Sequence, residues 1–173
     1  MTGKWIKDGV FADMTMELDG RMVSNPTDEM LRKAGYEPYV PTDSELLTQA
    51  ITEKVLEIEA YDTEVKGDVN VFYLGAMPMW FDRDKRMTIR NGVESSQKMG
   101  RTTYDIWDDE TGLSFSVPCD TALQILAAVE VYALDCLSTT NKHKAAVKAL
   151  TSLEEVAAYD YKSGYPEHLT FAL

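Results

Sequence analysis

The stretch CDTALQILAAVEVYALDCL, residues 119–137, decides the fold predicted for this chain. It is apolar on nearly every side of a helical projection. A helix of that kind is typical of a segment buried against several neighbours. We therefore expect a central core helix here, with Cys119 and Cys136 as inert buried thiols.

Two further helices are predicted downstream. The first covers residues 141–150, with Ala145, Ala146, Ala149 and Leu150 facing inward and His143 on a solvated polar face. The second begins at Ser152 and reaches Tyr159, because Ser152 and Glu155 have capping-box spacing. In the tail, Leu169 and Phe171 alternate as in a short strand added to a sheet edge, so we expect an ordered terminus that closes the core.

Upstream of residue 119 the pattern predicts two hairpins around a helix. Residues 68–74 are predicted to form a strand with Val69, Val71 and Tyr73 on one side. Residues 79–81 are predicted to form the second strand of this hairpin. Asp82 is placed to cap a helix that ends at Gly100, although Gly92 weakens it. Residues 102–107 and 113–117 form the second hairpin, and we interpret Trp80 and Trp107 as core residues.

The front of the chain differs in character. Residues 1–24 predict a small hairpin or two extended pieces, and a short helix capped by Asn25 or Thr27 ends at Gly35. Pro38 and Pro41 bracket a stiff linker. Thr42 and Glu45 form another capping box. It opens a helix whose inner stripe is predicted to hold Leu47, Ile51, Val55, Ile58 and Tyr61.

The predicted fold class is α+β: a small antiparallel sheet, made of two hairpins and a C-terminal strand, packed against a buried helix, with an N-terminal arm and helix. We expect a docking arm with a short helix at residues 1–41, a connecting amphipathic helix at 42–63 and a C-terminal α+β domain at 64–173.

Charge restricts the classes of partner. The chain has 173 residues with 29 acidic and 17 basic side chains, a net charge of −12. Nucleic-acid binding needs a basic face, and no run of Lys and Arg occurs, so we expect no nucleic-acid partner. Anionic membrane surfaces are disfavoured for the same reason, and no run of 18 apolar residues predicts a membrane span.

The sequence does not point to a particular reaction. With two histidines and no Cys-x-x-Cys, a zinc site is not predicted. The phosphate- and dinucleotide-binding glycine loops and the G-x-S-x-G nucleophile motif are missing. We therefore predict no catalytic residues, no cofactor and no metal. Acidic pairs for glycoside chemistry stay open, since 29 acids allow many pairings in space.

Aromatic and large apolar side chains in the first 41 residues are the candidates for contact with a partner, because such residues dominate interface energetics. A Trp at position 5 is equally compatible with packing on its own domain. The candidate docking residues are Trp5, Phe11, Met14, Leu18, Met30, Tyr36 and Tyr39.

From about residue 58 to the end, the chain resembles an uncharacterised domain family of tailed phages and prophages of gut anaerobes. The matching motifs are Met-Trp-Phe-Asp at 79–82, the strand-ending Trp107, the segment 118–136, HKAAVKAL at 143–150 and the closing stretch 159–171. The segment NPTDEMLRKAGYEPY (25–39) also resembles an N-terminal module of small proteins encoded near phage tail fibres.

The resemblance implies a place among tail-fibre-associated and tail-assembly proteins and no defined reaction. The expected function is therefore a non-enzymatic, tail-associated structural or adaptor protein. Its partners would be other tail or fibre proteins and further copies of itself, as a trimer or dimer. It would reside in the host cytoplasm during assembly and then in the virion tail. The alternatives are an assembly chaperone that leaves before the virion matures, and a glycan-acting enzyme.

Overall fold

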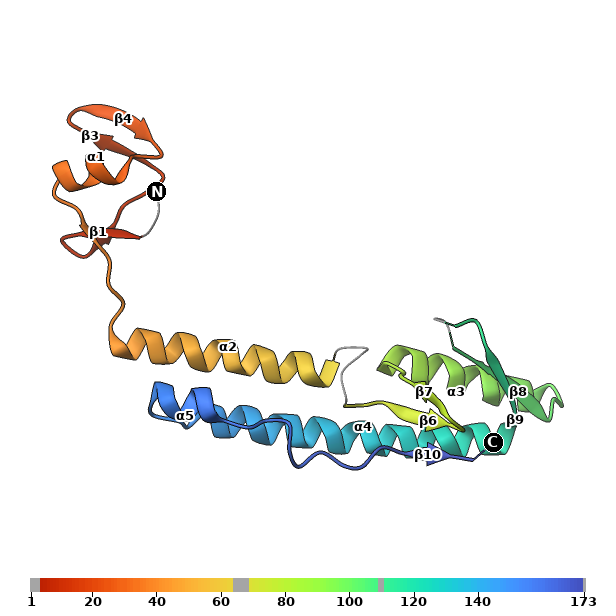
Figure 1. Ribbon diagram of the computed structural model, residues 1–173. Helices are drawn as coiled ribbons and strands as arrows, with labels where there is room; N and C mark the ends of the chain where they lie inside the picture. The colour runs from red at the N-terminus through yellow and green to blue at the C-terminus, as the bar shows by residue number, and fades with distance from the viewer. Residues whose placement is uncertain (1–3, 64–68, 109–110, 173) are drawn as a thin grey trace. The chain divides into compact units, whose positions relative to one another are not determined.

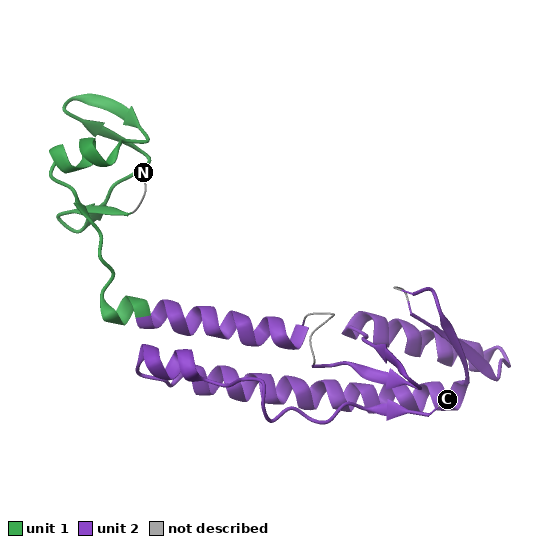
Figure 2. Ribbon diagram, in the orientation of Figure 1, with its two compact units in different colours: residues 1–46 green, residues 47–173 purple. Residues whose placement is uncertain are grey.

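The chain folds into two compact units. The computed structural model describes residues 4–63, 69–108 and 111–172. Unit 1 comprises residues 1–46 and unit 2 residues 47–173, as Figure 2 shows. The helix α2 (Asp43–Thr63) begins in unit 1 and continues into unit 2.

Unit 1 is built from two short hairpins, an added strand and one helix. The antiparallel sheet has the order β2-β1-β5, and β3 pairs antiparallel with β4. Both hairpins turn on Asp-Gly pairs with positive φ, 51° and 80° at Asp8-Gly9 and 50° and 75° at Asp19-Gly20, the conformation of a type I′ turn. The element bounds are β1 (Trp5–Lys7), β2 (Val10–Phe11), β3 (Thr15–Leu18), β4 (Arg21–Ser24), α1 (Asp28–Lys33) and β5 (Glu37–Pro38).

The segment expected to be an arm therefore has its own small core. Trp5 and Leu31 are buried there together with Pro26. Thr27, one of the two predicted caps, accepts a hydrogen bond from the Met30 backbone and begins α1. Pro38 pairs with Trp5 in the sheet, so the extended linker starts only after this strand.

Unit 2 is organised around one long helix, α4 (Cys119–Lys148), which Figure 1 shows in cyan and blue. The sheet β10-β6-β7, the helix α3 and the hairpin β8–β9 pack against its first half, and α2 and the short α5 lie beside its second half. The remaining bounds are β6 (Phe72–Leu74), β7 (Met77–Met79), α3 (Arg83–Lys98), β8 (Thr103–Trp107), β9 (Ser114–Pro118), α5 (Leu153–Ala158) and β10 (Thr170–Phe171).

This arrangement confirms the predicted α+β class. One buried cluster joins both sheets, α3 and the first half of α4, with Phe72, Val93, Ile106 and Leu126 each nearly inaccessible. Full burial of such side chains contributes about 1.5–3 kcal/mol apiece. The C-terminal strand is present as predicted, but it pairs parallel with β6, so the three-stranded sheet is mixed rather than purely antiparallel.

The helix predicted at 119–137 and the one predicted at 141–150 are a single helix. The residues between them, Ser138 to Thr140, include neither Gly nor Pro, and the Thr139 hydroxyl donates to the Asp135 carbonyl within the helix. Ser and Thr are weak helix formers, but they do not end a helix that is stabilised by tertiary packing. A glycine or proline would be needed to interrupt it. The buried side of this part of the helix therefore differs from the predicted one. Thr140 and Val147 are buried, whereas Ala145, Ala146 and Ala149, which were predicted to face inward, are exposed.

The strand predicted at 68–74 is shorter in the structure, where β6 covers Phe72–Leu74 and residue 68 lies outside the described residues. The structure buries Phe72 and Leu74 of β6, while Tyr73 is half-buried. Asn70, with a φ of 66°, interrupts the extended backbone before β6, so the alternation that starts at Val69 does not continue into the strand.

Candidate functional site

Trp5 is not available to a partner, because it belongs to the core of unit 1. Only 3% of the residue is exposed. The Arg32 guanidinium lies 5.3 Å from its ring centroid, a cation–π contact that covers the ring further. Of the two uses that the sequence allowed for this side chain, the structure selects packing on its own domain.

Phe11 and Tyr39 form an aromatic pair on unit 1, with ring centroids 5.0 Å apart and edge-to-face geometry. Phe11 is 47% exposed, and the Lys4 ammonium lies 5.8 Å from its ring. The Tyr39 phenol donates a hydrogen bond to Glu45, which raises the pKa of the phenol and lowers that of the carboxylate. An exposed aromatic ring held in place in this way is a typical anchor at interfaces.

Three further predicted residues have different exposures. Met14 is 72% exposed, whereas Leu18 is half-buried on the inner face of its hairpin. Tyr36 is half-buried beside Lys7, whose ammonium lies 5.8 Å from the ring and donates to the Ala34 carbonyl.

Three methionines are among the exposed apolar side chains of unit 1. Met30 on α1 is exposed, as are Met22 on β4 and Val10 on β2, and the last two are not among the predicted docking residues. The pairing of Met22 with Glu17, on the outer side of the β3–β4 hairpin, is the signal that could have identified Met22. Flexible methionine side chains adapt to a partner surface at little strain.

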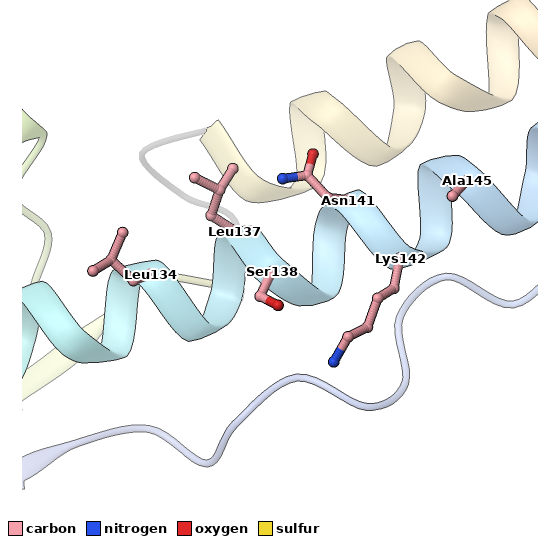
Figure 3. A pocket seen from close by; sticks show the side chains of 6 residues that line it. All are labelled: Leu134, Leu137, Ser138, Asn141, Lys142 and Ala145. Atoms are coloured by element: carbon pink, nitrogen blue, oxygen red, sulfur yellow. The ribbon is translucent and has the colours of Figure 1, made fainter.

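Unit 2 carries a second exposed apolar surface, on α4. The sequence predicts burial on several sides, but Val131, Leu134 and Leu137 are 60%, 55% and 47% exposed. Leu134 and Leu137 border a shallow hollow of about 540 Å³ that continues along Ser138, Asn141 and Ala145. Figure 3 shows these side chains along the helix.

Among the described residues, α4 is also the one helix whose length and composition would let it span a membrane, a criterion that core helices of soluble proteins meet too.

The opposite side of α4 holds the C-terminal tail. His143, expected to be solvated, is half-buried, and its Nε2 lies 2.9 Å from the Ser163 carbonyl. Since a carbonyl only accepts, Nε2 carries the proton in the neutral ring and the Tyr159 hydroxyl donates to Nδ1 at 2.9 Å. The Tyr165 and Thr140 hydroxyls are hydrogen-bonded at 2.9 Å. These contacts fix the tail, so we interpret the residues as structural.

Buried polar groups gather where the chain enters β6. Asn70 donates to the backbone and carboxylate oxygens of Asp62, which is 6% exposed. Burial raises the pKa of both the Tyr132 phenol and the Cys136 thiol. Both cysteines are buried and unpaired, as predicted. A thiol whose pKa is raised is largely protonated at neutral pH and is a poor nucleophile.

The remaining tryptophans differ from expectation in one case. Trp80 is half-buried, but Trp107, at the end of β8, is 54% exposed and therefore not a core residue. Strand alternation explains this, because Ile106 is the residue of that strand that faces the core.

Comparisons with protein-family models, with curated proteins and with solved structures found no match for the chain. Within the described ranges, no cluster of three His, Cys, Asp or Glu side chains has the geometry to hold a metal ion. Two surfaces of the described residues expose large apolar side chains, those of unit 1 and the outer face of α4.

Proposed function

We propose that the chain is a non-enzymatic assembly protein of a phage tail, acting as a structural subunit or adaptor in the neighbourhood of the tail fibre. The phage context comes from the resemblance of residues 58–173 and 25–39 to tail-associated proteins. It would be made in the host cytoplasm and retained in the tail of the virion.

The observation that carries this proposal is the exposed apolar surface of unit 1. In a unit of 46 residues, Val10, Phe11, Met14 and Met22 are between 47% and 72% exposed. Exposed apolar side chains in such number favour a contact with another protein. Unit 2 would supply the scaffold, with its tail fixed against α4.

Mass spectrometry of purified particles tests the proposal. A subunit or adaptor is expected in a fixed ratio to the other tail proteins. Absence from mature particles, with presence in infected cells, would contradict the subunit role and favour an assembly chaperone that leaves.

A variant directed at unit 1 sharpens this test. Phe11→Ser combined with Met14→Ser removes exposed apolar area and leaves the buried Trp5 and Leu31 in place. The variant is expected to fold but to be lost from particles. Leu113→Ser, which changes a 52% exposed leucine in unit 2, is the matched control and should be incorporated normally.

A further inference from the structure

We propose that the exposed face of α4 pairs two copies of this chain, helix against helix and antiparallel. This inference deepens the proposed assembly role by naming a second copy as a partner. It rests on the same proposed function but uses a different surface, on unit 2.

The first observation is a repeat on the exposed face. Six exposed residues follow one another at alternating spacings of four and three, and together they are called the outer seam: Ala127, Val131, Leu134, Ser138, Asn141 and Ala145. This spacing averages 3.6 residues, the repeat of a straight α-helix, and keeps all six on one side of the helix. The inner side of α4 already packs on its own unit, so the outer seam is a second packing face of the same helix.

The second observation is the order of charges along α4. All acidic side chains of the helix precede all basic ones: Asp120, Glu130 and Asp135, then Lys142, Lys144 and Lys148. Three acids and three bases leave the helix with no net charge, although the chain carries −12. The helix therefore contributes none of the net repulsion that opposes self-association.

This order of charges decides the orientation. Glu130 is already paired with Arg86, and Lys144 with Glu59, within the same chain, so the attraction between copies acts through Asp135 and Lys142. Antiparallel pairing brings these opposite charges toward each other, whereas parallel pairing would align like charges. The helix dipole does not account for the pattern, because its effect is confined to the first and last turns. Glu130 and Lys142 both lie in the interior of α4.

Side-chain size along the outer seam fits the same orientation. The larger side chains, Val131 and Leu134, come first, and Ser138 and Ala145 come later. Antiparallel pairing about a point between Leu134 and Ser138 places Leu134 of one helix over Ser138 of its partner and Val131 over Asn141, while the outermost pair is Ala127 with Ala145. The hollow that runs from Leu134 to Ala145 is where those larger side chains would be received.

Asn141 lies within the outer seam and would face Val131 of the second copy. A buried Asn in such a seam fixes the register of the pair at a cost in stability. On the edge of the seam, Asp135 of one copy comes within side-chain reach of Lys142 of the other.

Sedimentation velocity of the full chain over a wide range of concentrations tests the pairing. We expect a monomer–dimer equilibrium. Leu134→Glu should raise the dimer Kd by about 30-fold or more, the effect of losing one interface hot spot. Because Leu134 is exposed, the thermal unfolding midpoint of the diluted monomer should stay unchanged, and Leu113→Glu on the hairpin is the matched control.

Charge exchange tests the orientation. Asp135→Lys alone and Lys142→Asp alone should each weaken the dimer, and the two changes together should restore it, since the opposite signs again face each other.

Cross-linking provides a second test of orientation. In the antiparallel pair the two copies of residue 137 are offset by about 3 Å along the axis and those of residue 145 by about 27 Å. Leu137→Cys should therefore cross-link with a short bifunctional reagent and Ala145→Cys should not. Unsubstituted protein, with its two buried thiols, gives the background.

Three results would overturn the inference: a monomer at every concentration, a dimer indifferent to Leu134→Glu, or equal cross-linking at both positions. A monomer that instead co-sediments with phosphatidylcholine vesicles through this face would overturn it as well. A monomeric chain still found in particles would refute the pairing alone, whereas a dimer absent from particles would refute the subunit role alone.

Discussion

At the scale of single residues, Gly92 shows how a position unfavourable for a helix is required by packing. It lies inside α3, where glycine costs about 1 kcal/mol relative to alanine. A Cβ at this position would lie 2.7 Å from the Tyr104 hydroxyl oxygen and 3.1 Å from two of its ring carbons. The glycine lets β8 and α3 approach closely enough to bury Ile106 and Val93 between them.

Gly92→Ala is accordingly expected to destabilise unit 2, by about 1 kcal/mol, despite the better helix propensity of alanine. In a Tyr104→Phe background, where the closest atom is removed, the same substitution should be less harmful. Urea denaturation of the parent chain, the two single variants and the double variant measures the coupling between the two positions. A gain in stability from Gly92→Ala alone would show that Tyr104 moves aside at little cost.

Glu155 is the second residue with a testable role. It accepts from the Thr151 backbone and from the backbone of Ser152, while the Ser152 hydroxyl accepts from the Glu155 backbone. These hydrogen bonds, that from Thr151 foremost, lower the pKa of the carboxylate below its ordinary value of 4.5. The charged form therefore stabilises α5 above pH 4.5, and this contribution is lost as the pH falls through the lowered pKa.

Glu155→Gln should make the free energy of unfolding of unit 2 depend less on pH between neutrality and pH 3. Denaturant titrations at several pH values measure this slope, with Glu154→Gln on the same turn as the control. If both variants keep the slope of the parent chain, the capping carboxylate does not contribute to acid sensitivity.

At the scale of elements, α4 and the C-terminal tail stabilise each other. The tail contributes β10 to the sheet, and Leu169 and Phe171 pack against the main core. Phe171 is mostly buried, so it supplies most of the roughly 1.5–3 kcal/mol that complete burial contributes to stability. The Tyr165 ring also contacts Tyr61 of α2 at 5.6 Å, which joins the tail to a third element.

In a chain that ends at Lys162, the free energy of unfolding of unit 2 should fall by on the order of 3 kcal/mol or more. The strand β10, its packed side chains and the hydrogen bonds to His143 and Thr140 are all lost together. Thermal unfolding followed by circular dichroism measures the loss. Tyr165→Phe, which removes only the hydrogen bond to Thr140, should cost about 1 kcal/mol. Truncated protein that melts like the full chain would show that the tail does not close the core.

At the scale of the whole molecule, the two units differ in the size of their buried cores and are therefore expected to differ in stability. Unit 2 buries a core shared by two sheets and two helices, whereas unit 1 buries little beyond Trp5, Pro26 and Leu31. A unit of 46 residues is near the lower size limit for independent folding.

Trp5→Ala should therefore unfold unit 1, since removing a buried Trp costs about 3–5 kcal/mol, while unit 2 keeps its unfolding midpoint. A two-dimensional amide NMR spectrum separates the effects: signals of unit 1 are expected to collapse and those of unit 2 to persist. Simultaneous loss of both sets of signals would mean that the units fold as one.

Local chemistry was sufficient to predict most element types and ends. Thr27, Thr42, Asp82 and Ser152 begin helices as predicted, because a capping side chain acts on backbone groups a few residues away. The β8–β9 hairpin, the α+β class and the buried cysteines also follow from short-range pattern and composition. These features depend on interactions between residues close together in the sequence, so they can be predicted from it.

Only the tertiary structure decided which side of each apolar segment would be buried. Val131 and Leu134 are as apolar as Ile125 and Leu126, yet one pair is exposed and the other is buried, because the sheets and α3 cover only one side of α4. Trp107, predicted to lie in the core, is exposed because the neighbouring Ile106 is the residue of β8 that faces the core. Composition determines how much apolar surface a chain has, but burial depends on which elements meet across long stretches of sequence.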